Sequence, residues 1–371
     1  MEKLRVLIAD DSVLSRKAVA EAVESTGTGQ VEHTAPNGSI AVEWLQQSAI
    51  DVVLLDAFMV GQNSLEILKE IKEGYPDIEV IMLSDGEARC AEVTIEALAH
   101  GAFDFILKTI DPDPVKTVEK IKNQLGVLFT QIKVKNYSIH GNGVSHLSDK
   151  KVAGAVNNGA QPASQGSNKG RILQGKPDLI LIASSTGGPA ALEMLLKQLP
   201  GTFPIPILIV QHMPPEFTNV FAQTLDKKCQ MQVREAKNGD LVQTGQIVIA
   251  AGGMHMTVGR QESGGMEIRL NNSPFVNGVR PSADVLFNSV AKAYEGKNLL
   301  AVILTGMGND GVQGVGEMKK NCYCHCITQS EETCVVYGMP RCVVEAGLSD
   351  ETADMADIAG RICQIVSVEG S

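Results

Sequence analysis

The sequence predicts an α/β protein built on two separate parallel sheets, and three observations support this. Short runs of β-branched and other apolar residues alternate with longer segments whose apolar residues recur every three or four positions. This alternation stops in a stretch rich in Gly, Ser and Asn and resumes after Pro177. The 371 residues are enough for two domains, each with its own core.

The N-terminal part, residues 1–124, is expected to form one domain of five βα units. The expected strands are residues 4–9, 31–34, 52–56, 80–84 and 105–108. Amphipathic segments such as 15–24 and 39–47 lie between them and predict helices that cover a five-stranded parallel sheet.

Residues 125–176 are expected to form a linker. Periodicity is lost from about residue 135, where small and polar residues dominate. A flexible chain of about 40 residues has an r.m.s. span near 35 Å, which lets two domains meet without fixing how. Control of one domain by the other would therefore need a docking surface.

Residues 177–371 predict a second, doubly wound α/β domain. Its expected strands are 179–184, 205–211, 247–250 and 299–305, and helical segments such as 190–198 and 282–294 separate most of them.

Composition narrows the class of protein. The formal net charge of −11 argues against a nucleic-acid partner, because phosphate binding needs concentrated Lys and Arg. The N-terminus has no signal-peptide pattern, and no apolar run is long enough to cross a bilayer, so membrane insertion is not expected. Eight cysteines without a secretory segment indicate reduced thiols and a cytoplasmic protein.

Acidic residues end two of the N-terminal strands. Asp10 and Asp11 follow the first strand and Asp56 ends the third, so all three should meet at the carboxyl edge of the sheet. A hard divalent cation, usually Mg²⁺, would relieve their repulsion, and one carboxylate could then accept a phosphoryl group. The Ser84 hydroxyl could donate a hydrogen bond to the phosphoryl group, and Lys108 could add a positive charge. Any one of these five residues alone is typical of a solvated loop, but all five at one edge of the sheet favour a phosphoryl-binding site.

This set resembles the phosphorylation pocket of response-regulator receiver domains, over residues 1 to about 124. The resemblance implies a flavodoxin-like fold, Asp56 as phosphoacceptor, Ser84 and Lys108 as phosphoryl-switch residues, and a histidine kinase as phosphodonor. The sequence departs from the family pattern at Val60 and at residues 62–64, and it has Thr109 where receivers commonly have a cis-proline. We expect a different local loop shape there.

A serine turn ends the first C-terminal strand. Ser185-Thr186-Gly187-Gly188-Pro189 precedes a helix, whose N-terminus offers free N–H groups to a developing oxyanion. The motif alone also fits an anion-binding loop. Ser184 competes with Ser185 as the nucleophile, but Ser185 lies at the break.

An imidazole and a carboxylate end two further strands. His212 follows 205–211, and Asp310 lies in the glycine-rich turn after 299–305, so both could meet Ser185 above the sheet as a hydrolytic triad. His255 is a competing base; the strand-end position favours His212.

Several segments resemble the catalytic domain of chemotaxis protein-glutamate methylesterases: residues 184–188, 211–215, 280–287, 304–311 and 335–341. The resemblance implies Ser185 as nucleophile, His212 as base, Asp310 as orienting acid, and the N–H groups of Thr186 and Met307 as oxyanion donors. It also implies glutamate methyl esters of methyl-accepting chemotaxis receptors as substrates, with receptor glutamines deamidated too, and no cofactor for hydrolysis. Phosphorylation of Asp56 is expected to shift the receiver and uncover the triad.

Three other interpretations fit the sequence less well. Cys322, Cys324 and Cys326 suggest zinc, but alternate thiols of a strand lie about 6.8 Å apart, too far to share one metal, so packed thiols are expected. A catalytically inactive adaptor would show a broken triad, and none is visible. A nucleotide-binding oxidoreductase would need a full Gly-x-Gly-x-x-Gly run, which Gly187-Gly188 lacks.

Overall fold

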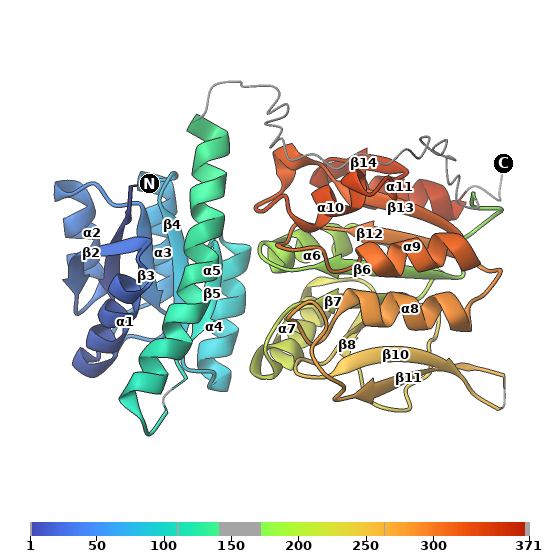
Figure 1. The fold of residues 1–371 in the computed structure, drawn as a ribbon, viewed down its shortest axis with the longest axis horizontal. Helices are drawn as coiled ribbons and strands as arrows, with labels where there is room; N and C mark the ends of the chain where they lie inside the picture. The colour runs from blue at the N-terminus through green and yellow to red at the C-terminus, as the bar shows by residue number, and fades with distance from the viewer. Residues whose placement is uncertain (1, 110, 141–171, 263, 368–371) are drawn as a thin grey trace, which may run out of the picture.

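The computed structural model describes residues 2–109, 111–140, 172–262 and 264–367, and it shows two α/β domains side by side (Figure 1). Most of the expected linker, residues 141–171, lies outside the described residues.

The N-terminal domain contains a five-stranded parallel sheet in the order β2-β1-β3-β4-β5. This is the flavodoxin-like order, with its switch point between β1 and β3. The predicted fold class is therefore confirmed for this domain. The strands are β1 (Leu4–Ala9), β2 (Gly29–Ala35), β3 (Val52–Asp56), β4 (Glu79–Ser84) and β5 (Asp104–Leu107).

Five helices cover the two faces of this sheet: α1 (Val13–Ser25), α2 (Gly38–Gln47), α3 (Ser64–Gly74), α4 (Ala88–Ala99) and α5 (Pro114–His140). Helices α1 and α5 pack together on one face, and α2, α3 and α4 follow one another on the other. Three of these helices have a short polar residue at the N-cap, as residue preferences at this position predict. The side chains of Ser12, Asn37 and Asn63 accept hydrogen bonds from backbone N–H groups in the first turns of α1, α2 and α3.

The expected start of the linker at residue 125 is wrong. Helix α5 continues to His140, because Leu125, Phe129 and Ile132 keep helical spacing and are buried in the core formed with α1 and the sheet.

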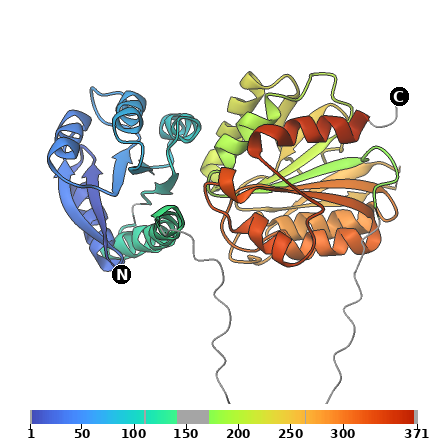
Figure 2. The ribbon, with the colours of Figure 1, turned by 90° about the horizontal axis from the view of Figure 1, so that it is seen from above.

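The C-terminal domain contains a seven-stranded sheet in the order β14-β13-β12-β6-β7-β9-β8, and every pair in it is parallel. Helices cover both faces (Figure 2), which confirms the doubly wound class. The strands of the sheet are β6 (Leu179–Ser184), β7 (Ile207–Gln211), β8 (Gln232–Glu235), β9 (Gln246–Ile249), β12 (Asn298–Ile303), β13 (Tyr323–Gln329) and β14 (Glu351–Ala353).

An antiparallel hairpin, β10 (His255–Arg260) and β11 (Met266–Asn271), stands apart from this sheet and was not predicted. It packs on α8, which belongs to the layer of α8, α9 and α10. Helix α6 lies with α7 and α11 in the other layer. The helices are α6 (Gly188–Leu196), α7 (Pro215–Lys228), α8 (Ala283–Ala293), α9 (Val312–Asn321), α10 (Met339–Glu345) and α11 (Met355–Ser367).

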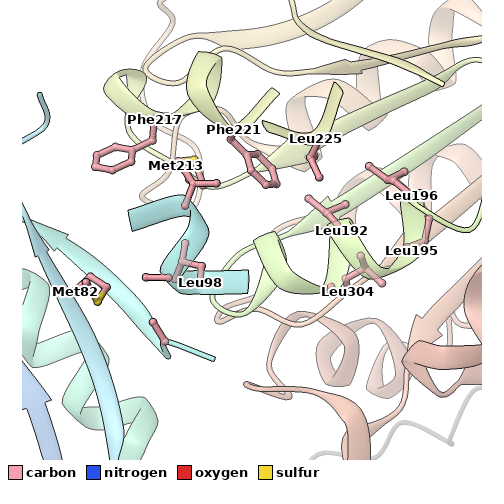
Figure 3. Close-up of a cluster of buried hydrophobic side chains, with 14 of the residues drawn as sticks. Met82, Leu98, Leu192, Leu195, Leu196, Met213, Phe217, Phe221, Leu225 and Leu304 are labelled. Carbon is pink, nitrogen blue, oxygen red and sulfur yellow. The ribbon is translucent and has the colours of Figure 1, made fainter. Parts of the chain in front are cut away.

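The two domains share an apolar contact. Helix α4 packs on α6 and α7, and the Phe105 ring of β5 lies 4.3 Å from the Phe217 ring of α7. Figure 3 shows Leu98 of α4 between Met82 of the N-terminal sheet and the leucines of α6. Buried side chains of both domains thus form one continuous cluster, which docks β5 and α4 against the second domain.

Candidate active site

Three adjacent strands of the C-terminal sheet carry the predicted triad. In the order β12-β6-β7, Asp310 follows the first strand, Ser185 the second and His212 the third. Because the strands are parallel, all three residues lie at the same edge of the sheet. Backbone bonds tie these ends together: Ser185 N–H donates to Thr305 O at 3.0 Å and His212 N–H donates to Ser184 O at 3.1 Å.

The serine turn needs its two glycines. Gly187 has φ 77°, and a Cβ there would lie 2.6 Å from Val335 Cβ. A Cβ on Gly188 would lie 2.0 Å from Gln211 Oε1, closer than real Cβ contacts allow. These glycines let the turn lie directly on the neighbouring strand ends, where α6 begins.

His212 and Asp310 form a hydrogen bond of 2.8 Å between Nε2 and Oδ2. This leaves Nδ1 as the ring nitrogen available to take a proton from a serine. The bond spans 98 residues of sequence and joins two side chains that are almost fully buried.

Asp310 is surrounded by donors. Besides His212, its carboxylate accepts Ser282 Oγ–H at 2.6 Å, Ala283 N–H at 2.6 Å, Asp284 N–H at 3.2 Å and Asn277 Nδ2–H at 3.0 Å. Burial alone would raise its pKa, but the bonds from His212, Ser282 and Ala283 outweigh this and lower the pKa to about 2. Asp310 is therefore charged throughout the neutral range.

Ser185 is half-buried, and its hydroxyl makes no hydrogen bond to any described residue. Ser184 Oγ is buried and donates to Gln211 Oε1 at 2.7 Å. Of the two candidates, Ser185 thus has the available hydroxyl. Catalytic hydrogen bonds are often long before substrate binds, so an open serine is compatible with the triad.

The competing base, His255, lies elsewhere. It is fully buried and its Nε2 bonds Pro274 O at 3.0 Å, so a backbone carbonyl rather than a carboxylate orients it. This geometry favours His212 as the base.

The predicted oxyanion donors are free in the described part of the chain, where neither Thr186 N–H nor Met307 N–H has an acceptor. Their side chains, however, contact the N-terminal domain. Thr186 Oγ1 donates to Asp104 Oδ2 at 2.7 Å, and Gln131 Nε2 donates to Met307 Sδ at 3.0 Å. Asp104 and Gln131 were not predicted; no local pattern in the sequence marks them.

The predicted acidic pocket forms at the carboxyl edge of the N-terminal sheet. Asp10, Asp11 and Asp56 each offer an oxygen, and these oxygens lie within 4.8 Å of one another. Lys108 Nζ bonds Asp10 Oδ2 at 3.0 Å and Asp56 Oδ2 at 2.7 Å. Three clustered carboxylates are a donor set that suits Mg²⁺.

Burial raises the pKa of Asp56 to about 6; Lys108 opposes this shift and Asp10 adds to it. Ser84 is buried beside it at the end of β4, where its Oγ accepts Gly86 N–H at 3.5 Å. The structure thus brings together all five residues predicted for this pocket.

Residues that depart from the receiver pattern after Asp56 make local hydrogen bonds in the structure. Val60 N–H donates to Asp11 Oδ2 at 2.8 Å, Gln62 Oε1 accepts Gly38 N–H at 2.5 Å, and Asn63 begins α3. The Lys108–Thr109 peptide is not cis; the cis bond among the described residues precedes Pro281.

Comparison with known proteins decides the family. The CheB methylesterase family model matches residues 180–362, and the response regulator receiver domain model matches residues 6–120. A protein-glutamate methylesterase/protein-glutamine glutaminase of Desulfotalea psychrophila is 38% identical over 99% of this chain and 100% of its own length. The chain belongs to this family of protein-glutamate methylesterases/protein-glutamine glutaminases.

Two other matches are similar to this chain in sequence. The Geobacillus kaustophilus relative of the same name is 36% identical over 99% of both chains. The solved catalytic domain of Thermotoga maritima CheB methylesterase is 38% identical, with a TM-score of 0.49, and covers 52% of this chain and 100% of that one.

The cysteines of this methylesterase-family chain lie where packed thiols were expected. Cys324 and Cys326 lie on the extended strand β13, Cys322 directly precedes it, and all three are buried in the apolar core. Burial raises the pKa of Cys324 to about 12 and also raises the pKa of Cys326 well above its usual range. Of the helices described, none is long and apolar enough to cross a bilayer.

Proposed function

We propose that this chain is a phosphorylation-activated hydrolase that removes methyl groups from glutamate methyl esters of methyl-accepting chemotaxis receptors. The observation that carries the proposal is the bonded pair His212–Asp310, held next to the serine turn on adjacent strand ends. The relatives' names supply the substrate class. The intact pair argues against the inactive adaptor, whose mark would be a broken triad.

In the acylation step, Ser185 Oγ attacks the ester carbonyl carbon while His212 Nδ1 accepts the hydroxyl proton. Asp310 stabilises the imidazolium, and its donors keep it ionised. The N–H groups of Thr186 and Met307 donate to the tetrahedral oxyanion. Collapse breaks the C–O bond to the methoxy group, which leaves as methanol with the proton from His212.

In the second step, water attacks the acyl-serine with His212 as base, and the products are a glutamate side chain and free Ser185. A glutamine side chain passes through the same acyl-enzyme, with ammonia as the leaving group. The one site therefore serves demethylation and deamidation, and neither step needs a cofactor.

The N-terminal pocket is the proposed phosphorylation site, with Asp56 as acceptor and a chemotaxis histidine kinase as donor. Asp10, Asp11 and Asp56 would hold Mg²⁺, which supplies positive charge to the phosphoryl oxygens when bound. Lys108 and Ser84 then contact the phosphoryl group. The proposed location is the cytoplasm, where the kinase and the receptor tails are accessible. We do not propose nucleic acid as a partner.

The proposed control is displacement of the receiver from the catalytic domain. In the docked arrangement β5 and α5 contact Thr186 and Met307, the two residues of the oxyanion turns, through Asp104 and Gln131. Substrate entry would require these contacts to part. Phosphorylation at Asp56 favours the parted state by rearranging β5, which carries Phe105 and is followed directly by Lys108.

The direct test is methanol release from methylated receptor by the wild-type protein and by Ser185→Ala. We expect the variant to lose at least about 10⁴-fold in kcat, because the acyl-enzyme cannot form. Ser184→Ala is the matched control and should stay within about tenfold of wild type, since this hydroxyl only bonds Gln211. Near-full activity of Ser185→Ala would exclude Ser185 as nucleophile.

Gating is tested with beryllofluoride, which mimics the phosphoryl group on Asp56. We expect faster methanol release from the wild type and no change in Asp56→Asn, whose basal rate should match the wild type. A wild-type rate that does not respond to beryllofluoride would refute the gating proposal while leaving the triad untouched.

A further inference from the structure

A second buried carboxylate lies against the orienting acid of the triad. Asp284 and Asp310 are 1% and 2% exposed, and Asp284 N–H donates to Asp310 Oδ1 at 3.2 Å. The Asp284 carboxylate accepts Gly311 N–H at 3.0 Å and Gly314 N–H at 2.7 Å, at the start of α9. Two like charges this close in a buried site repel each other unless a donor lies between them.

Asn277 provides that donor. Its Nδ2 bonds Asp284 Oδ2 at 2.8 Å and Asp310 Oδ1 at 3.0 Å. A side-chain amide has two N–H groups, so each carboxylate receives one. Because both neighbours are acceptors, the amide must present its nitrogen here, and the orientation of the side chain is fixed.

The backbone conformation at residue 277 explains only in part why an asparagine stands there. Val276 and Val279 pair through bonds of 3.2 and 3.0 Å, which makes Asn277-Gly278 a two-residue turn with φ 54° and 77°. Turns with positive φ at both central residues favour Asn, Asp or Gly at the first position. The turn would therefore accept all three residues, whereas the pair of carboxylates accepts only the amide.

We propose that Asn277 is a positioning residue of the hydrolase: its amide joins Asp284 to Asp310 and fixes Asp310 against His212. This inference rests on the proposed function of the triad. Asn277, with Ser282, occupies Asp310 Oδ1, so that Oδ2 stays with His212. Without the amide, the carboxylates of Asp284 and Asp310 face each other unbridged, and the Asp310 carboxylate can rotate out of line with the imidazole while its charge stays beside His212.

The test compares wild type with Asn277→Gly and Asn277→Asp, both of which keep the turn. At neutral pH and with beryllofluoride present, we expect kcat for methanol release to fall about tenfold in Asn277→Gly, the loss of one hydrogen bond to a charged group. The fall in Asn277→Asp should be about 100-fold, because a third carboxylate replaces the donor. KM should not change, since Asn277 acts through Asp310 rather than on the substrate.

A pH profile separates positioning from a merely structural role. Each change leaves more uncompensated negative charge beside His212, which favours the imidazolium. The acid limb of kcat/KM should therefore move to higher pH in the order wild type, Asn277→Gly, Asn277→Asp. A residue needed only for the turn would leave the limb where it is in both variants.

NMR titration of the His212 ring in the full-length protein tests the same shift without substrate. The pH midpoint of the ring signal should rise in the order wild type, Asn277→Gly, Asn277→Asp. The signal is assigned by its absence from the spectrum of His212→Gln. Unchanged ring titration and unchanged kcat in both variants would overturn the inference. If wild type released no methanol while the ring titration still shifted in this order, the proposed function would fail and the role of Asn277 toward Asp310 would stand. Should one variant not fold, the titration of the other decides.

Discussion

Two buried carboxylates, one beyond the carboxyl edge of each sheet, have opposite pKa shifts. Asp56 and Asp310 both lie at the carboxyl edge of a parallel sheet, where burial favours the protonated form of each. The pKa of Asp56 is raised to about 6, and that of Asp310 is lowered to about 2. Position in the fold therefore does not decide the protonation state.

The difference comes from the donors around each group. Asp56 accepts Lys108 and a long 3.3 Å bond from Phe58 N–H, and Asp10 repels it. Asp310 accepts hydrogen bonds from His212, Ser282 and three further groups. A sparsely bonded carboxylate keeps oxygen lone pairs for a phosphoryl group, whereas a saturated one can only orient its partner.

Asp104, at the domain interface, is an intermediate case. Burial raises its pKa to about 6, against the opposing bonds from Thr186 Oγ1–H and Phe105 N–H. Two donors do not offset the desolvation of this carboxylate. The donors to each carboxylate, together with the neighbouring charges of Lys108, Asp10 and His212, account for the three shifts.

The largest effect is expected for Asp310→Asn. The amide carries no negative charge to stabilise the imidazolium and hold the ring in one tautomer, so kcat for methanol release should fall about 10⁴-fold. The measurement is steady-state methanol release with beryllofluoride present. Asp357→Asn, an exposed change in the first turn of α11, is the control and should match the wild type. A small loss in Asp310→Asn would show that donor saturation of this carboxylate has no catalytic role.

Asp56→Asn should increase stability. The folded pKa of about 6 exceeds the unfolded value of 3.8, so the folded state binds more protons between these values and stability falls as pH rises through this window. At pH 8 without Mg²⁺, removing the charge should raise the free energy of unfolding by about 2 kcal/mol, and at pH 3.5 by almost nothing.

The stability measurement is urea unfolding followed by fluorescence of Trp44, the one tryptophan of the chain, which lies in the N-terminal domain. Asp51→Asn is the opposite control: Arg5 lowers the pKa of Asp51 against the effect of burial, so this variant should destabilise the same domain. Destabilisation by Asp56→Asn at pH 8 would contradict the donor account.

The smallest effect is expected for Asp104→Asn, which removes the charge that docking desolvates while keeping an acceptor for Thr186. Docking should tighten, so basal methanol release at pH 8 should fall about threefold. Glu119→Gln, an exposed change on α5, should leave the rate unchanged. A faster basal rate in Asp104→Asn would mean that the ionised carboxylate stabilises docking.

Much of the fold and of both sites follows from the order of residues along the chain. Runs of β-branched residues separated by helical periodicity specify parallel sheets, and in such sheets the residues that end the strands meet at one edge. Asp10, Asp56 and Lys108 could therefore be grouped from sequence, as could Ser185, His212 and Asp310. Their catalytic and phosphoryl-transfer roles stay predictions.

Tertiary structure alone decided which other groups meet these residues. Asn277 lies in a turn 33 residues from Asp310, and Asp104 lies 82 residues from Thr186 in the other domain. The extension of α5 to His140 likewise depends on packing against α1. The physical reason is the same in each case: strand ends are aligned by local periodicity and a regular sheet, whereas loop-to-strand and domain-to-domain contacts depend on how whole elements pack.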